Sequence, residues 1–272
     1  MPIKTISLPS LPPFEIDVHD ASDQYLSRFI LETGIYEPIE TISILRLLAN
    51  NVDFVDLGAN VGWYTLIAGT ALRGRGRVHS FEPDPDNFTK LSANVARNAL
   101  HNVAIYKWAI SDRIGSGLLY RAQDNLGDHQ LYDNGAGRTA VTVDVRTLDS
   151  YPEISRERPV IVKMDTQGSE LRILRGMNEL LTTHPHELVI VSEYCPKMLV
   201  DNRSSPKEMI DLLRSAGFSI LLIDRIRRML QPVTWNFIEE CTAGIIAPAT
   251  ENFFDLILYR KPDGIIRSLF NG

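Results

Sequence analysis

Two hydrophobic periods alternate along most of this chain. Short apolar runs, bounded by glycine, proline or charged residues, are followed by stretches in which apolar residues recur every third or fourth position. The first pattern predicts buried strands and the second predicts amphipathic helices. A regular exchange between the two is typical of a largely parallel sheet that is covered by helices on both faces. The pattern therefore predicts an α/β fold.

The predicted elements follow from these two periods and from the turn residues between them. The strands are expected at residues 54–57, 77–81, 103–110, 160–164, 187–193, 218–223 and 254–259. The helices are expected at residues 38–50, 64–72, 85–98, 169–181 and 206–216. Prolines stand at the start of several of these helices, where a missing N–H has no cost. We expect a mostly parallel, seven-stranded sheet.

A glycine-rich stretch interrupts the alternation. Two alternating strand patterns, at residues 117–121 and 139–146, flank a long loop, which predicts a β-hairpin insertion at about 113–147. Loops of more than about 12 residues are usually functional or disordered. We expect residues 51–272 to form one Rossmann-like domain that contains this insertion. Residues 1–50, with strand-like pieces and one helix, are expected to pack on or cap the core.

Composition and charge narrow the classes of function. The chain has 272 residues, 44% of them hydrophobic and 23% charged, with a formal net charge of −6. These values are ordinary for a globular protein, and the acidic balance gives no footprint for nucleic acid. No signal-peptide pattern or membrane-spanning run is visible, so we expect a cytoplasmic protein without a membrane partner. The two cysteines lack metal-ligand spacing, and no metal is expected.

The most informative motif is the turn Asp-Leu-Gly-Ala-Asn-Val-Gly at residues 56–62. Its glycines let the backbone approach a ligand, and the helix start that follows offers free N–H groups. The turn differs from the Gly-x-Gly-x-x-Gly fingerprint, which makes a nicotinamide-dependent dehydrogenase the weaker alternative. Asp56 either bonds to its own turn or lies near a charged ammonium group of a cofactor.

Acidic side chains occur at or just after the ends of five predicted strands. They are Asp56, Glu82, Asp112, Asp165 and Glu193. The carboxyl ends of parallel strands meet at one edge of a sheet, where ligands of open α/β folds bind. Glu82 is spaced to accept hydrogen bonds from ribose hydroxyls, and the alternative is an acid that stabilises a helix N-terminus.

Several ordered segments together resemble the FkbM family of methyltransferases. They are residues 36–38, 56–62 with Thr65, 81–87, 109–112, 147–149, 163–170 and 174–176. The resemblance covers roughly residues 36–194. It implies a Rossmann-like class I methyltransferase fold and S-adenosyl-L-methionine as the cofactor. It also implies, most often, O-methylation of a hydroxyl on a small-molecule natural product or a sugar.

The motifs and the resemblance together give a set of candidate site residues. Cofactor contacts are expected from Asp56, Gly58, Asn60, Gly62, Thr65, Glu82, Pro83, Ala109 and Asp112. The candidate general bases are Asp165, at a strand end, and His129, whose ordinary pKa suits neutral pH. Glu193, Tyr194 and Gln167 are expected to face the substrate.

Gln167 is a departure from the family pattern. Many members carry Glu at this position, and an amide cannot act as a base. The departure leaves open a non-catalytic, cofactor-binding partner subunit as an alternative function. A divalent metal held by Asp165 is a further alternative, although no tight carboxylate cluster supports it. Homodimerisation is also left open.

Overall fold

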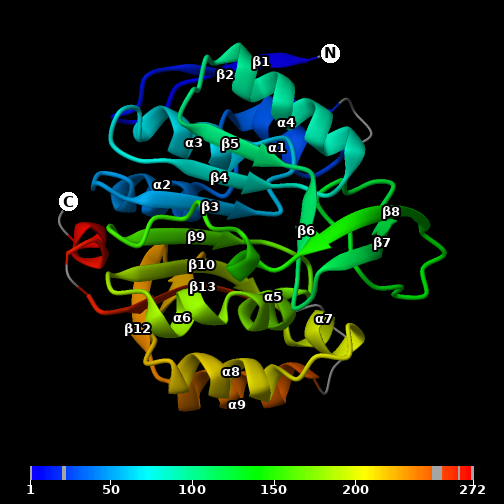
Figure 1. The fold of residues 1–272 in the computed structure, drawn as a ribbon, viewed down its shortest axis with the longest axis vertical. Coiled ribbons are helices and arrows are strands. Elements are labelled where there is room, and N and C mark those ends of the chain that lie inside the picture. Colours follow the sequence, from blue (N-terminus) through cyan, green and yellow to red (C-terminus); the bar gives the residue numbers. More distant parts are fainter. Residues whose placement is uncertain (1, 20–22, 247–252, 263, 271–272) are drawn as a thin grey trace.

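The computed structural model describes residues 2–19, 23–246, 253–262 and 264–270 (Figure 1). Its main sheet has the strand order β12-β11-β13-β10-β9-β3-β4-β5. The strands are β3 (Asp53–Leu57), β4 (Val78–Phe81), β5 (Val103–Tyr106), β9 (Val160–Met164), β10 (Leu188–Tyr194), β11 (Ser219–Asp224), β12 (Met229–Val233) and β13 (Phe254–Arg260). From β5 to β10 neighbouring strands are parallel, and β13 runs antiparallel to both β10 and β11. The predicted α/β fold is confirmed.

The sheet has an eighth strand, which corrects the expected seven. β12 pairs antiparallel with β11 at the edge of the sheet. Its residues are mostly exposed and include Pro232, so the segment lacks the apolar run of a buried strand. Proline is tolerated there because an edge strand needs only one row of backbone hydrogen bonds.

Helices cover both faces of this sheet. One face carries β1 (Ile3–Ile6), β2 (Phe14–Asp17), α1 (Leu26–Thr33), α2 (Pro38–Leu47), α3 (Trp63–Ala71) and α4 (Pro85–Arg97). The other carries α5 (Glu170–Gly176), α6 (Asn178–Thr183), α7 (Pro196–Asp201), α8 (Pro206–Ser215), α9 (Trp235–Ile246) and the short 3-10 helix η1 (Leu148–Ser150). The 3-10 helix η2 (Ile266–Leu269) packs beside α2. β3 and β9 are buried along their whole length, which explains why most of their residues are apolar.

Two predicted elements are divided in the structure. The expected strand at 103–110 breaks at Lys107, because β6 (Trp108–Ile110) leaves the main sheet and pairs with β8 (Thr139–Arg146). β8 also pairs with β7 (Gly115–Arg121), which confirms the predicted hairpin. Figure 1 shows this three-stranded sheet beyond the carboxyl ends of the main strands. The expected helix at 169–181 breaks at Met177 into α5 and α6.

A buried asparagine fixes the N-terminal hairpin to the glycine turn. The Asn94 side chain of α4 accepts a hydrogen bond from the Asp17 backbone N–H (2.7 Å). It also donates to the carbonyl oxygens of Asp17 (2.9 Å) and Val61 (2.8 Å). These three bonds hold β2 and the turn against the same helix.

Among the described helices, none is long and apolar enough to span a bilayer.

Candidate active site

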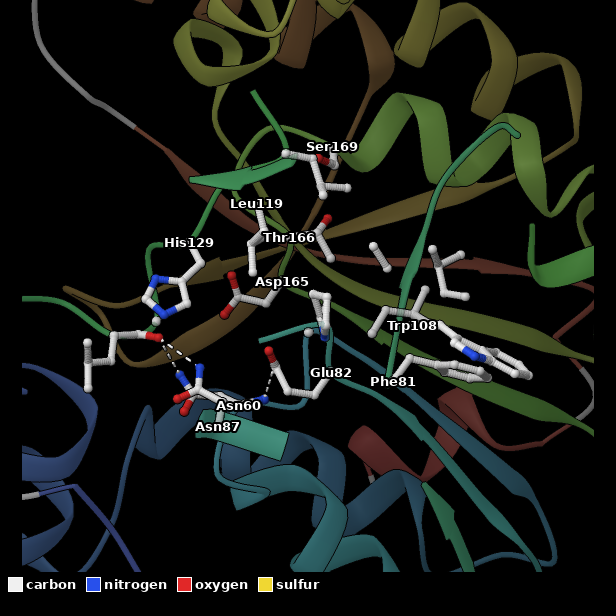
Figure 2. Close-up of a pocket in the computed structure, with 18 residues that line it drawn as sticks. Asn60, Phe81, Glu82, Asn87, Trp108, Leu119, His129, Asp165, Thr166 and Ser169 are labelled. Carbon is white, nitrogen blue, oxygen red and sulfur yellow. Dashed lines mark hydrogen bonds between the residues drawn. The ribbon is translucent and has the colours of Figure 1, made fainter. Parts of the chain in front are cut away.

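A pocket opens at the carboxyl ends of β3, β4 and β9 (Figure 2). The insertion forms its opposite wall through β6, β7 and the loop between β7 and β8. Its lining includes Asn60, Glu82, Trp108, His129, Asp165 and Ser169. The pocket therefore lies where ligands bind in open α/β sheets.

Gly58 lets two strands approach closely at the base of this pocket. Its φ is +80°, and a Cβ atom added there would lie 2.2 Å from the carbonyl oxygen of Asp165. An L-side chain is therefore excluded by both backbone conformation and space. The turn places Gly58 and Asn60 in the pocket wall, as expected for cofactor contacts.

Glu82 is the buried acid of the pocket. Its carboxylate accepts hydrogen bonds from the backbone N–H groups of Asn60 (2.7 Å) and Asp84 (2.8 Å). Burial raises the pKa of Glu82 to about 8, against the opposing effect of those two N–H groups. The side chain is only 4% exposed and lines the pocket beside Pro83. A carboxylate held in this way still has lone pairs that can accept hydrogen bonds from hydroxyl groups of a ligand.

Asp56, the acid of the glycine turn, forms hydrogen bonds behind the pocket rather than in its wall. Asp56 accepts a hydrogen bond from the Thr65 hydroxyl (2.6 Å), which also bonds to the Ser80 hydroxyl (2.7 Å). Burial raises the pKa of Asp56 to about 6. These contacts join β3, α3 and β4 behind the pocket. Asp56, Gly62, Thr65 and Asp112 do not line it, whereas Ala109 does.

An aromatic stack forms one end of the pocket. Trp108 stacks on Tyr106 with ring centroids 4.7 Å apart, and Phe81 stacks on Tyr106 at 5.3 Å. Trp108 and Phe81 both line the pocket. The sequence analysis missed this flat apolar surface because Trp108 lies in a strand pattern that continues without a break past Lys107.

The insertion loop is fastened directly to the glycine turn. The carbonyl oxygen of Leu126 accepts hydrogen bonds from the side-chain amides of Asn60 (3.2 Å) and Asn87 (3.1 Å). The backbone N–H of Gln24 also donates to the Asp124 carbonyl (3.0 Å). Figure 2 shows Asn60 and Asn87 side by side, with His129 of the loop near them. The loop thus covers the part of the pocket nearest the turn.

His129 lines the pocket with a defined hydrogen-bonding state. Its Nδ1 accepts a hydrogen bond from the Ala122 backbone N–H (3.2 Å). The neutral ring must therefore carry its proton on Nε2, which lies 3.8 Å from the Asp84 carboxylate. Burial lowers the pKa of His129, so the neutral ring is favoured. In this state neither ring nitrogen is free to accept a substrate proton.

Asp165 has a different environment. Its carboxylate accepts a hydrogen bond from the Gln167 side-chain amide (2.7 Å) and lies 3.5 Å from the Lys163 ammonium. The side chain is 25% exposed and faces the same pocket as His129 (Figure 2). Gln167 does not itself line the pocket and contacts it only through the carboxylate to which its amide donates.

A family model for the FkbM methyltransferase domain matches residues 56–220. The chain belongs to the FkbM methyltransferase family. It is an S-adenosyl-L-methionine-dependent methyltransferase with the class I, Rossmann-like fold. Gly58, Asn60 and Glu82 fit that cofactor. Gly58 has no side chain to block a ligand, and it meets the buried Glu82, which the Asn60 N–H holds, at one edge of the sheet.

Two curated relatives of this FkbM methyltransferase carry informative names. The hexuronic acid methyltransferase AglP of Haloferax volcanii is 29% identical over 181 residues, which cover 65% of this chain and 69% of that protein. The 31-O-demethyl-FK506 methyltransferase FkbM of Streptomyces tacrolimicus is 27% identical over 198 residues, with coverages of 61% and 72%.

Solved structures of other methyltransferases are also similar in fold. A precorrin-6y C5,15-methyltransferase from Geobacter metallireducens has a TM-score of 0.45 and 13% identity, covering 85% of this chain and 92% of that one. A putative methyltransferase from Streptococcus mutans, in complex with SAH, has a TM-score of 0.41 and 13% identity, with coverages of 83% and 98%. Membership of the FkbM family does not depend on either.

The two remaining substrate candidates of this FkbM methyltransferase point to opposite faces of β10. Tyr194 is 1% exposed, and its hydroxyl bonds to that of Thr242 in α9 (3.0 Å). Glu193 lies across from Asp255 in the β10–β13 pair. Burial and the nearby carboxylates raise the pKa of Glu193 to about 9. Neither residue lines the pocket.

Metal ligation has no support in the described part of the FkbM methyltransferase. No three His, Cys, Asp or Glu side chains are grouped there so as to hold an ion.

One charged residue next to the site was missed by sequence analysis. Lys163 lies inside the apolar run of β9, and a charge in such a run is itself a signal, because buried lysines are rare unless paired.

Proposed function

We propose that this FkbM-family enzyme methylates a hydroxyl group of a small-molecule natural product or sugar, with Asp165 as the general base. One observation carries the proposal: Asp165 is partly exposed in the pocket wall and is oriented from behind by the Gln167 amide. Glu82, the other acid in the described lining, is tied to two backbone N–H groups. It is therefore the candidate for cofactor binding.

The cofactor end of the site follows from the same contacts. S-adenosyl-L-methionine, when bound, supplies a methyl group on a positively charged sulfur that is a good leaving group. Glu82 would accept hydrogen bonds from the ribose hydroxyls, and Gly58 would let the backbone approach the ligand. The flat face of Trp108 would cover an aromatic base. Asp56 would act indirectly, by fixing the turn through Thr65.

Asp165 would remove the proton that an alcohol loses when it accepts a methyl group. Positioned bases of this kind contribute about 10²–10⁴-fold to a rate. His129 would position the insertion loop instead, because its Nδ1 is occupied by the Ala122 N–H. Gln167 would hold the Asp165 carboxylate by one hydrogen bond without adding a second negative charge beside it.

The named relatives support a hydroxyl-bearing acceptor. One is named for a hexuronic acid, which is a sugar acid, and the other for an oxygen position of FK506.

The test uses methyl-labelled S-adenosyl-L-methionine with hydroxylated acceptors, namely uronic acid glycosides and hydroxylated macrolides. We expect label in an ether oxygen, and a loss of about 10²–10⁴-fold in rate for Asp165→Asn. Calorimetry should show that Asp165→Asn binds S-adenosylhomocysteine within about threefold of wild type. Asp144→Asn is the matched control, because Asp144 is exposed and outside the pocket. Undiminished transfer by Asp165→Asn, or label in carboxyl esters or on nitrogen alone, would contradict the proposal.

A further inference from the structure

Lys163 is an unusual residue for its position. It lies in β9 between Val162 and Met164, and its side chain is only 4% exposed. Removing an ammonium group from water costs several kcal/mol unless opposite charges compensate for the loss. Such a residue therefore needs close partners, and their identity indicates what the charge is for.

The partners of Lys163 connect the interior to the pocket. The ammonium lies 3.5 Å from Oδ2 of Asp165 and 4.0 Å from Oε2 of Glu37. It also lies 5.2 Å from the ring centre of Tyr64, whose hydroxyl donates to Glu37 (2.6 Å). A cation over an aromatic face is attracted by the ring, which adds to the two ion pairs. The ammonium is thus held from one side by Glu37 and Tyr64 and presented to Asp165 on the other.

Other titratable or charged groups lie around this pair on the neighbouring elements. They are Tyr36 and Glu37 just before α2, Glu40 in its first turn, Asp56 on β3, Tyr64 on α3, His129 in the insertion loop, Glu170 on α5, Glu193 on β10, Arg225 after β11 and Asp255 on β13. The acids outnumber the cations. Burial among them raises the pKa of Glu193 to about 9 and that of Asp255 to about 8.

The second cation of the cluster is engaged elsewhere. The Arg225 guanidinium lies 2.8 Å from Glu40 and 2.6 Å from Asp255. Within the described residues, Lys163 is therefore the cation that forms an ion pair with Asp165. Without it, Asp165 would keep, among the described residues, only the neutral Gln167 amide as a side-chain partner. An opposite charge at this distance favours the ionised form of a carboxyl, and a protonated carboxyl cannot act as a base.

We propose that Lys163 is a positioning residue that supplies the positive charge beside the Asp165 carboxylate at the edge of the pocket, while Gln167 fixes the direction of that carboxylate. The inference rests on the proposed role of Asp165 as the base. It assigns two separate tasks to two neighbours: Lys163 supplies charge and Gln167 supplies orientation.

The experiment is an NMR titration of the full chain without any acceptor. Aspartate is labelled with ¹³C at the side-chain carboxyl and lysine at Cε, and the signals are assigned with Asp165→Asn and Lys163→Arg. In the wild type, the Lys163 Cε signal should shift with the same midpoint as the Asp165 carboxyl. Asp165→Asn should abolish that step. Lys163→Met should move the carboxyl midpoint upward by about one to three pH units, and Lys163→Arg should restore it.

Each outcome decides the matter. A Lys163 signal that ignores Asp165, or an unchanged carboxyl midpoint in Lys163→Met, overturns the inference. If Lys163→Met does not fold, the wild-type and Asp165→Asn titrations still give the answer. Binding of S-adenosylhomocysteine checks that the variants keep an intact site. Because no acceptor is used, coupled titration together with undiminished transfer by Asp165→Asn would refute the proposed base and leave the ion pair standing.

Discussion

The buried Glu82 makes a strong prediction about the pH dependence of cofactor binding. Its pKa is raised to about 8, so about one carboxyl in eleven is ionised at pH 7 and about ten in eleven at pH 9. If the ionised form accepts both ribose hydroxyls, affinity should follow that fraction. We expect about a tenfold gain from pH 7 to pH 9, which corresponds to about 1.4 kcal/mol.

The assay needs a ligand that does not titrate in this range. 5′-Methylthioadenosine contains the ribose and adenine but lacks the amino acid groups, so calorimetry with it isolates the protein's own ionisation. In Glu82→Gln the dependence should disappear, because an amide cannot ionise and can accept with only one of its two polar atoms. Its affinity at pH 9 should also be at least tenfold below that of wild type, since a backbone N–H then meets an amide N–H.

The control variant is Asp255→Asn. The pKa of Asp255 is also raised to about 8, but this residue lies on β13, outside the pocket. It should leave the pH dependence of 5′-methylthioadenosine binding in place. The reasoning is wrong if wild-type affinity is flat from pH 7 to pH 9, or if Glu82→Gln keeps the wild-type slope.

Three further predictions concern stability. Gly58→Ala should lower the free energy of unfolding by at least about 3 kcal/mol and abolish S-adenosylhomocysteine binding, because the new Cβ would lie 2.2 Å from the Asp165 carbonyl oxygen. Gly74→Ala has a similar φ of +72° but open space, so denaturant titration should show a loss of only about 1–2 kcal/mol; equal losses would contradict the steric argument. Asn94→Ala should cost about 2–4 kcal/mol, since three buried hydrogen bonds disappear, and Asn50→Ala, with one partly buried bond, should cost about 1 kcal/mol or less. Glu82 alone should cost the unliganded protein about 4 kcal/mol of stability between pH 5 and pH 9. An acid whose pKa is higher in the folded than in the unfolded state stabilises the fold fully below the unfolded pKa, and this contribution is lost as the pH rises through the folded pKa of about 8. In chemical denaturation at several pH values, Glu82→Gln should show a flatter dependence of stability on pH.

Much of the main sheet could be predicted from the sequence, because a strand that is buried on both faces consists mostly of apolar residues. β3 and β9 are buried throughout, and apolar residues make up most of both strands, with Asp53, Asp56 and Lys163 as the exceptions. The break at Lys107 has no such signal, since Trp108–Ile110 keep the apolar character of a strand while changing sheets. β12 is missed for the opposite reason, because an edge strand with a proline has almost no buried side to mark it.

The site is predictable in position but not in the orientation of each side chain. Strand ends gather at one edge in any parallel sheet, and the pocket is there. The side that a residue faces depends on the pleat, which alternates with every residue. This is why Tyr194 faces α9 while Glu193 lies across from Asp255, and why Asp56 bonds to Thr65 behind the pocket.

The choice between the two candidate bases shows what local sequence cannot carry. A histidine beside asparagine and aspartate in a glycine-rich loop has the composition of a catalytic group. Whether it can accept a proton depends on a contact within the insertion, between the residue after β7 and the loop that follows: the Ala122 N–H bonds to the lone pair of Nδ1, and the protonated Nε2 lies toward Asp84. Asp165 depends equally on groups far away in the chain, since Glu37 holds the lysine that holds it. Because a proton acceptor is defined by the hydrogen bonds already made to it, neither residue could have been ranked before those partners were in place.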